Sequence, residues 1–428
     1  MIPAVVSQAA LGRMPGPVGL ADVLLPYLWV LIAALVASLV MTPLMRRLAL
    51  SNGIVDWPDL KRKAHVQPVA YLGGVAILLG WLTGIAVAMM TEPHNNDLTH
   101  SHYSSVNFPL SIILGAGVIT LTGLFDDVYG ISPRVKIGGQ LFAAAALAWQ
   151  DVGTRLAASS LGLLGLHPPD WVTYLLGTFI IAVFVIGGCN SLNLLDGLDG
   201  LAAGVTGIAT AGFLAIAAIL AVRSYDAVAG PGVDAWIDPV RIVMCLAILG
   251  AVLGFLPYNF NPAAIFMGDA GSLLLGYLGA ATILLFAQTS GKGPLLVTAA
   301  LIVFALPITD TSLAIIRRKL RGRPIFSPDC EHIHHLLRRS GLSVKQAVGV
   351  LYSLAAAFAV LGCSLVMMQL RWRYVLAVFF VMYAAIMVTA YLYGRRLARL
   401  ENLSVGLPQS SPSGESPLLG ATAPTDSR

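Results

Sequence analysis

Charged residues are scarce in this chain of 428 residues, where Asp, Glu, Lys and Arg together make up 11%. Soluble domains carry about 25% charged residues, whereas hydrophobic residues account for 57% of this chain. The balance excludes an ordinary soluble globular domain. It indicates an integral membrane protein that crosses the bilayer several times.

Cysteine is also rare, since the four cysteines are scattered and show no paired spacing. Three of them lie in apolar runs, which suits buried, reduced thiols better than disulfides. Residues 1–20 lack the basic start and contiguous apolar core of a cleavable signal peptide. No repeat of fixed period is visible, which counts against a transporter built from duplicated halves.

Apolar runs of about twenty residues, the length that crosses a bilayer, recur along the chain. Eleven candidates lie near 23–43, 71–90, 108–125, 136–150, 172–189, 201–222, 240–258, 272–289, 294–316, 346–368 and 374–393. The run at 136–150 is the weakest, because it is short and rich in alanine. We therefore expect an all-α, polytopic membrane protein with about eleven transmembrane helices.

Lysine and arginine predict the orientation of these helices. With the N-terminus outside, 19 of the 26 Lys and Arg residues fall on the inner side, as the positive-inside rule requires. An odd number of spans then places the C-terminus inside. The net charge of +5 is accounted for by these loops, so we expect no nucleic-acid partner. The expected parts are an external segment 1–22, a membrane domain 23–400 and a disordered cytoplasmic tail 401–428.

The most informative stretch is 190–204, which carries Asn190, Asn193, Asp196 and Asp199 at steps of three. On a helix this spacing places side chains on one face. Acids beside long apolar runs are costly and usually functional. The alternative, helix capping alone, needs one polar residue rather than four.

A second pair of acids, Asp126 and Asp127, ends the third apolar run, and Arg134 and Lys136 follow. Adjacent carboxylates repel unless a cation or a proton lies between them. A hard divalent cation such as Mg²⁺ would relieve this repulsion, and the two basic residues could meet phosphate or an anionic lipid. An exposed acidic turn at a helix end is the alternative interpretation.

The third motif contains Gly268, Asp269 and Gly271 at the start of the eighth apolar run. The glycines permit close approach of another backbone. The N–H groups of a helix N-terminus suit phosphate, and Asp269 could bind a metal that the phosphate also binds.

A fourth cluster, His332, His334 and His335, follows Cys330 in the large basic loop. Zinc is an alternative for Cys and His, but the spacing is too tight for a familiar structural site. Histidines among many arginines favour a pocket for a polyanion, and membrane anchoring through the arginines alone is the remaining alternative. All four clusters fall on the predicted inner side, so we expect one site that faces the cytoplasm.

These blocks, taken in order, resemble the polyprenyl-phosphate N-acetylhexosamine-1-phosphate transferase superfamily, or glycosyltransferase family 4. The matching blocks are 123–127, 190–200, 261–272 and 332–335. The His-Ile-His-His motif and eleven spans are similar to the bacterial branch that uses GlcNAc. Cys330 and Leu336 stand where basic residues are common in that branch.

The resemblance implies transfer of a sugar-1-phosphate from a UDP-N-acetylhexosamine, GlcNAc foremost, to undecaprenyl or another polyprenyl phosphate, with release of UMP. It implies Mg²⁺ as cofactor, with Mn²⁺ as a substitute, and a place in the bacterial inner membrane at the start of cell-envelope glycan synthesis. The resemblance leaves open whether the protein forms a homodimer. The alternatives are a phospho-MurNAc-pentapeptide transferase and, from another class, a proton-coupled transporter.

The resemblance also implies roles for individual residues. Asp269 and Asp196 would bind the metal, and Asp126 or Asp127 would act as base toward the acceptor. His334 and His335 would complete the catalytic set. The substrate-binding residues would be Asn190, Asn193, Asp196, Asp199, Gly268, Gly271, His332, Arg134 and Lys136.

Overall fold

The computed structural model of this chain describes residues 19–57, 68–91, 106–226, 237–320, 322 and 332–405. Its helical elements are α1 (Leu20–Leu24), the 3-10 turn η2 (Leu25–Tyr27), α2 (Leu28–Ser51), α3 (Gly73–Met90), α4 (Leu110–Tyr129), α5 (Pro133–Trp149), α6 (Arg155–Leu163), α7 (Asp170–Leu195), α8 (Leu201–Asp226), α9 (Ile237–Asn259), α10 (Gly268–Phe286), α11 (Gly293–Val303), α12 (Ala305–Leu320), α13 (Ile333–Arg339), α14 (Val344–Met367) and α15 (Trp372–Val405). Two short strands, β1 (Val55–Asp56) and β2 (Val69–Ala70), pair antiparallel.

Among the described residues, nine helices are long and apolar enough to cross a membrane, and α11 with α12 would add a tenth if the two count as one span. The chain is therefore an all-α, polytopic membrane protein, as the hydropathy pattern predicts. Which side faces the cytoplasm stays a prediction.

Two of the eleven predicted spans differ from the structure. Residues 294–316 do not form one straight helix, because the chain bends by 76° between α11 and α12. Pro307 lies in the first turn of α12, and its ring would clash with the carbonyl of Val303 if α11 continued. The run at 136–150 forms α5, a helix of 17 residues that does not reach the length of the nine spans.

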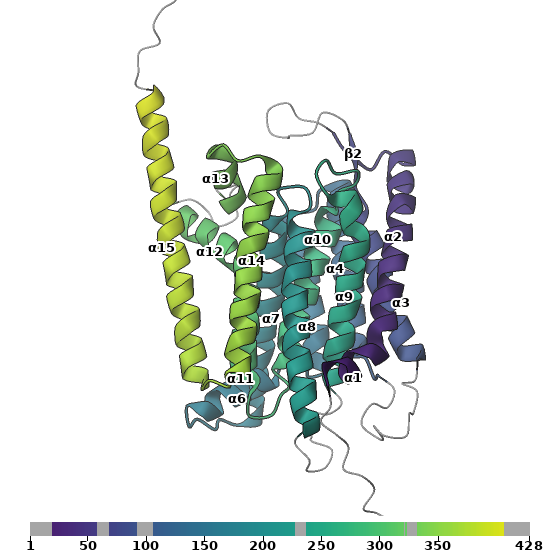
Figure 1. Cartoon of the computed structure of the whole chain (residues 1–428), viewed down its shortest axis with the longest axis vertical. Coiled ribbons are helices and arrows are strands. Elements are labelled where there is room, and N and C mark those ends of the chain that lie inside the picture. The colour runs from purple at the N-terminus through teal and green to yellow at the C-terminus, as the bar shows by residue number, and fades with distance from the viewer. Residues whose placement is uncertain are drawn as a thin grey trace, which may run out of the picture.

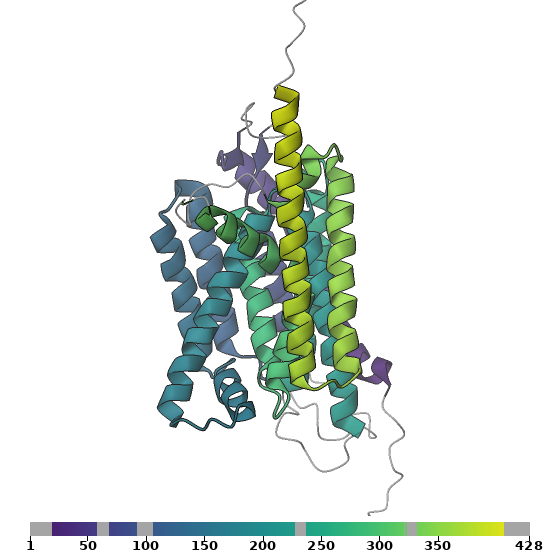
Figure 2. The same ribbon diagram turned by 90° about the vertical axis from the view of Figure 1, so that its left-hand side faces the viewer.

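The centre of the bundle is α10, the most deeply buried of the nine spans, whereas α15 is the least buried and stands along the outside (Figures 1 and 2). Helix α10 packs against α4 and α7. Glycines permit this close packing, since a Cβ on Gly276 would overlap the carbonyl oxygen of Gly188 in α7. The packing fixes the start of α10 relative to the ends of α4 and α7.

One end of the bundle carries the short strands and α13 (Figure 1). Ala70 in β2 forms a parallel bridge with Ile265, and its carbonyl accepts the N–H of Phe266 at 2.9 Å. The first loop of the chain is thereby joined to the segment that leads into α10.

The segment 190–204 does not form one helix, which corrects the expectation of a single face. Helix α7 ends at Leu195, Asp196 is its C-cap, and α8 begins only at Leu201. Gly200 adopts a positive φ of 76°, a conformation that glycine reaches without steric cost and that stops a helix. Any convergence of the four polar residues must therefore come from tertiary packing.

The predicted boundary of the C-terminal tail also shifts. Helix α15 continues to Val405, so residues 401–405 are helical. The rest of that tail, residues 1–18 of the predicted external segment, and Cys330 lie outside the described residues.

Candidate active site

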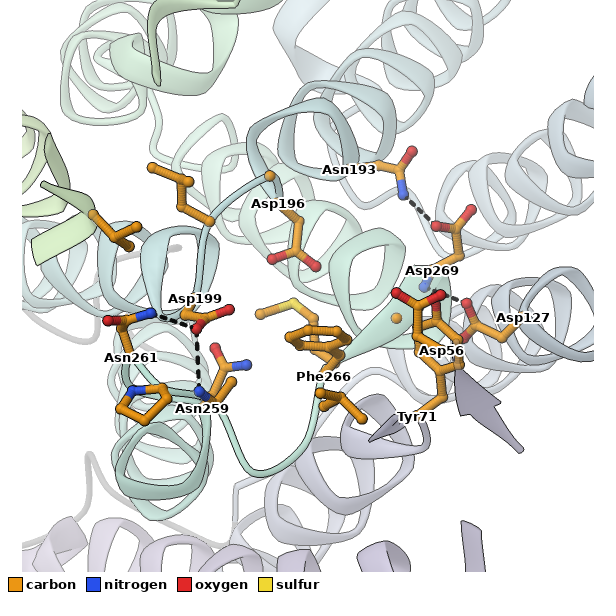
Figure 3. A pocket seen from close by; sticks show the side chains of 18 of the residues that line it. Asp56, Tyr71, Asp127, Asn193, Asp196, Asp199, Asn259, Asn261, Phe266 and Asp269 are labelled. Atoms are coloured by element: carbon orange, nitrogen blue, oxygen red, sulfur yellow. Dashed lines mark hydrogen bonds between the residues drawn. The ribbon is translucent and has the colours of Figure 1, made fainter. Parts of the chain in front are cut away.

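A pocket of about 520 Å³ opens at the end of the bundle that carries β2 and α13 (Figure 3). Five carboxylates line it, and they come from segments far apart in the sequence. These are Asp56, Asp127, Asp196, Asp199 and Asp269. The structure thus brings the predicted acidic clusters together at one site.

Asp127 joins α4 to the start of α10. Its Oδ1 accepts the backbone N–H of Asp269 at 2.7 Å, and its Oδ2 accepts that of Ala270 at 3.1 Å. Gly268 precedes them with a φ of +65°, and a Cβ there would overlap the Asp127 carboxylate. The prediction that these N–H groups are free for phosphate is wrong, because Asp127 caps them.

Lys136 bridges two of the acids. Its Nζ lies 2.6 Å from Oδ2 of Asp126 and 2.6 Å from Oδ2 of Asp269. The second oxygen of Asp269 accepts the amide of Asn193 at 2.8 Å, and the same amide reaches Ser272 at 2.9 Å. One ammonium group therefore neutralises part of the charge at the junction of α4, α5 and α10.

Asp196 faces the pocket from the end of α7. Burial raises the pKa of its carboxyl to about 8, and the charges of nearby carboxylates, Asp269 foremost, act in the same direction. This carboxyl therefore keeps its proton at pH 7, and a cation bound beside it would favour the ionised form.

Asp199 holds the loop before α10. Its Oδ2 accepts the amide of Asn261 at 2.8 Å and the backbone N–H of Ala263 at 3.1 Å (Figure 3). Asn259 fastens the same loop, because it accepts the N–H of Gly200 at 3.1 Å and donates to the carbonyl of Ile265 at 3.0 Å. Asp199 thus shapes the pocket wall as well as lining it.

The three histidines lie at the start of α13. Asp310 in α12 fixes the first, since its carboxylate lies 2.9 Å from Nδ1 of His332 and accepts the N–H of Ile333 at 2.8 Å. His334 is buried, and neither ring nitrogen has a hydrogen-bond partner among the residues that the structure describes. Burial, then the charge of His335, lowers the pKa of His334 to about 3, so the imidazole is neutral at pH 7. Of the three, His335 lines the pocket, together with Arg338.

Other predicted residues lie away from the pocket lining. Asn190 donates to Gln140 at 3.0 Å and to the carbonyl of Ile186 at 2.8 Å, so its amide ties α7 to α5. Arg134 is exposed and does not line the pocket. Gly271 serves packing, because a Cβ there would lie 2.7 Å from Met267.

Sequence reasoning missed Asp56 and Tyr71, which enter the pocket from the hairpin of the first loop. Burial, then the charge of Asp56, raises the pKa of the Tyr71 hydroxyl, so it keeps its proton. Neither residue belongs to a recognisable motif. Asp310 was missed as well, although an acid within an apolar run was a usable signal.

The donor atoms in the pocket suit a hard divalent cation. Within the described part of the chain, no group of three or more His, Cys, Asp or Glu residues could hold a metal ion by itself. Mg²⁺ does not require such a cage, because it is commonly bound by one or two carboxylates together with waters and substrate phosphates. Asp269 and Asp196 offer oxygen ligands in a pocket lined by five acids, so the residues present fit this ion.

Comparison with known proteins adds an independent line of evidence. Residues 109–287 match glycosyl transferase family 4, a range that includes all of the acids above except Asp56 and Asp310. The chain is 32% identical to a probable undecaprenyl-phosphate N-acetylglucosaminyl 1-phosphate transferase of Bacillus subtilis, over 77% of this chain and 82% of that protein.

The chain also aligns with most of the length of two further relatives. The decaprenyl-phosphate N-acetylglucosaminephosphotransferase of Mycolicibacterium smegmatis is 35% identical over 72% of this chain and 74% of its own. The undecaprenyl-phosphate alpha-N-acetylglucosaminyl 1-phosphate transferase of Escherichia coli is 31% identical over 73% and 76%. The chain therefore belongs to glycosyl transferase family 4, in the polyprenyl-phosphate N-acetylhexosamine-1-phosphate transferase superfamily and on the branch of these relatives.

Proposed function

We propose that this protein transfers GlcNAc-1-phosphate from UDP-GlcNAc to a polyprenyl phosphate and releases UMP. The names of its relatives support the sugar-phosphate and the lipid acceptor. The proposed place is the bacterial inner membrane, with the pocket facing the cytoplasm, because one substrate dissolves in lipid and the other in water.

The observation that carries the proposal is the junction of Asp126, Lys136 and Asp269. Two polyanionic substrates must approach each other in this reaction, so the site has to neutralise charge. Lys136 lies 2.6 Å from Asp126 and 2.6 Å from Asp269, and Asp269 lines the pocket, so this cation lies directly beside the pocket. It can exchange a carboxylate partner for a substrate phosphate.

We further propose that the reaction depends on Mg²⁺, held by Asp269 and Asp196. The ion would supply Lewis-acid stabilisation of the phosphate oxygens when bound. Asn193 keeps Asp269 oriented through its 2.8 Å hydrogen bond. His335 and Arg338, which also line the pocket, would bind the donor diphosphate.

We assign different tasks to Asp126 and Asp127, the two acids at the end of α4. Both oxygens of Asp127 accept backbone N–H groups, so this residue holds the pocket together. Asp126 contacts Lys136 through Oδ2 and accepts the N–H of Ile131 at 3.0 Å through Oδ1. We assign the base toward the acceptor phosphate to Asp126, because its Oδ2 is held by a lysine side chain, which can turn to a substrate phosphate, and not by backbone N–H groups.

The test uses purified full-length protein with undecaprenyl phosphate, a panel of UDP-sugars, and either Mg²⁺ or EDTA. We expect UMP and a polyprenyl-diphosphate product with UDP-GlcNAc and Mg²⁺, and neither with EDTA. Product with UDP-MurNAc-pentapeptide alone would instead support the phospho-MurNAc-pentapeptide reaction. No lipid product with any UDP-N-acetylhexosamine, from folded protein, would refute the proposal.

A further inference from the structure

A second cavity, of about 480 Å³, lies at the opposite end of the bundle. It is enclosed by the end of α8, the start of α11, and the connection between α14 and α15. These segments lie far from β2 and α13, because α8 and α14 begin near the active site and run the length of the bundle (Figure 1). The cavity therefore has no part in the site described above.

Four cations line this cavity, and no Asp or Glu is found among the described residues that line it. They are Arg223, Lys292, Arg371 and Arg373. Like charges brought into one cavity repel each other. Such a cluster is stabilised when an anion occupies the space between the charges.

The position of these four cations in the chain also favours a bound anion. Only seven Lys and Arg residues of the chain fall on the predicted outer side, where positive charge is depleted in membrane proteins. Four of those seven line this one cavity. A fifth, Arg241, is buried and paired with Asp238 at 2.8 Å, so it is not part of the cluster.

One of the cations is fixed in place. Arg223 donates to the carbonyl of Val366 at 3.1 Å and to that of Met367 at 3.0 Å, which caps the C-terminus of α14. Lys292, Arg371 and Arg373 are exposed. Arg373 donates to the hydroxyl of Tyr374 at 3.0 Å, so the cavity combines one guanidinium fixed by backbone carbonyls with three exposed cations.

The remaining walls of the cavity are mainly apolar and include one aromatic residue, Trp372. Leu220, Leu295 and Val366 form part of the lining. Trp372 donates its indole N–H to Thr298 at 3.2 Å at the start of α15, and tryptophan is typical of the membrane–water boundary. An anionic group joined to apolar chains matches this surface better than a free anion does.

We propose that this cavity binds the head group of an anionic phospholipid, with the phosphate among the four cations and the acyl chains along the apolar wall. A bound lipid would join α8, α11, α14 and α15 at this end. It would matter most for α15, the least buried of the nine spans in the described chain. The site is separate from sugar-phosphate transfer, so it stands or falls independently of the proposed function.

The test measures the affinity of the full-length protein for phosphatidylglycerol and for phosphatidylcholine by native mass spectrometry. The test variant is Lys292→Gln/Arg371→Gln/Arg373→Gln, which keeps Arg223 and its cap. The matched control, Arg155→Gln/Arg395→Gln/Arg396→Gln, removes three exposed charges elsewhere. Each cation near an anionic lipid is worth about fivefold in affinity.

We expect the native chain to prefer phosphatidylglycerol, the test variant to lose at least about tenfold in that affinity, and the control variant to keep it. Equal losses in both variants would show non-specific attraction and overturn the proposal. Full displacement of phosphatidylglycerol by an equal concentration of inorganic phosphate would identify a site for a small anion and would also overturn the lipid assignment.

Discussion

The carboxylate of Asp127 at the end of α4 accepts the backbone N–H of Asp269 at 2.7 Å, so it caps the start of α10. One acid thus positions another, although 142 residues separate them. The two acids have different tasks in this account: Asp127 maintains the geometry of the pocket, and Asp269 acts within it.

Replacement of Asp127 tests the first task. Asp127→Asn leaves one oxygen to accept two backbone N–H groups and places an amide donor against the other. Loss of a helix cap costs about 1 kcal/mol, so we expect a lower thermal unfolding midpoint together with lower turnover. The thermal unfolding of the purified variant in detergent, followed with its activity, checks this. An unchanged midpoint would contradict the capping role.

Asp269→Asn tests the second task. The change keeps the size of the side chain but removes the charge that faces Lys136 and the proposed metal. Metal-supported catalysis is commonly worth several kcal/mol, and about 1.36 kcal/mol is tenfold in rate. We expect turnover to fall by about a hundredfold or more, with a thermal unfolding midpoint close to that of the native chain.

The matched control for Asp269→Asn is Asp151→Asn, at the opposite end of the bundle. Asp151 accepts the hydroxyl of Thr154 at 3.1 Å and has a φ of +56°, and asparagine tolerates both. Its turnover should stay near that of the native chain. If Asp269→Asn turns over at a near-normal rate at limiting Mg²⁺, the metal assignment is wrong.

Hydropathy was enough to predict the fold class, because nine of the eleven apolar runs became long helices. The break between α11 and α12 could also be predicted from the sequence, since Pro307 interrupts the run at 294–316. The end of α7 was harder to predict. The even spacing of Asn190, Asn193, Asp196 and Asp199 indicated a helix, but α7 ends at Leu195 and Gly200, with its positive φ, separates it from α8.

The composition of the pocket was largely predictable, whereas the tasks of its residues were not. The acids were visible as clusters next to apolar runs. The cap that Asp127 provides depends on packing between α4 and α10, which no local pattern encodes. Asp56 and Tyr71 reach the pocket through the bridge between Ala70 and Ile265, a long-range pairing with no sequence signature.

The contact between His334 and the loop after α7 gives a further prediction. A Cβ on Gly197 would overlap Nε2 of His334, which is buried and stacked on His332 with ring planes 7° apart. Gly197→Ala should therefore displace the histidine cluster. Overpacking costs about 1–3 kcal/mol, and we expect at least tenfold lower turnover. Gly187→Ala is the control, because no atom of the described part of the chain lies within 4 Å of its added Cβ; equal activity of the two variants would refute the contact.

Asp310 is a positioning residue in this account, since it holds His332 and Ile333 but does not line the pocket. A hydrogen bond to a charged group is worth about 1.5–3 kcal/mol, so Asp310→Asn should lower turnover by about tenfold or more. If Asp310 acts through His332, the double variant Asp310→Asn/His332→Gln should be no worse than the more severe single variant. Losses that multiply would show that the two residues act independently.

The most direct measurement follows the fate of both parts of the donor. UDP-GlcNAc would carry ³H in the sugar and ³²P in the phosphate attached to it, and purified protein would receive undecaprenyl phosphate and Mg²⁺. Transfer of a sugar-1-phosphate predicts both labels in the lipid product at a constant ratio, with unlabelled UMP released. Lipid that carries ³H without ³²P, with the ³²P left on UDP, would contradict the account, because the sugar alone would then have been transferred.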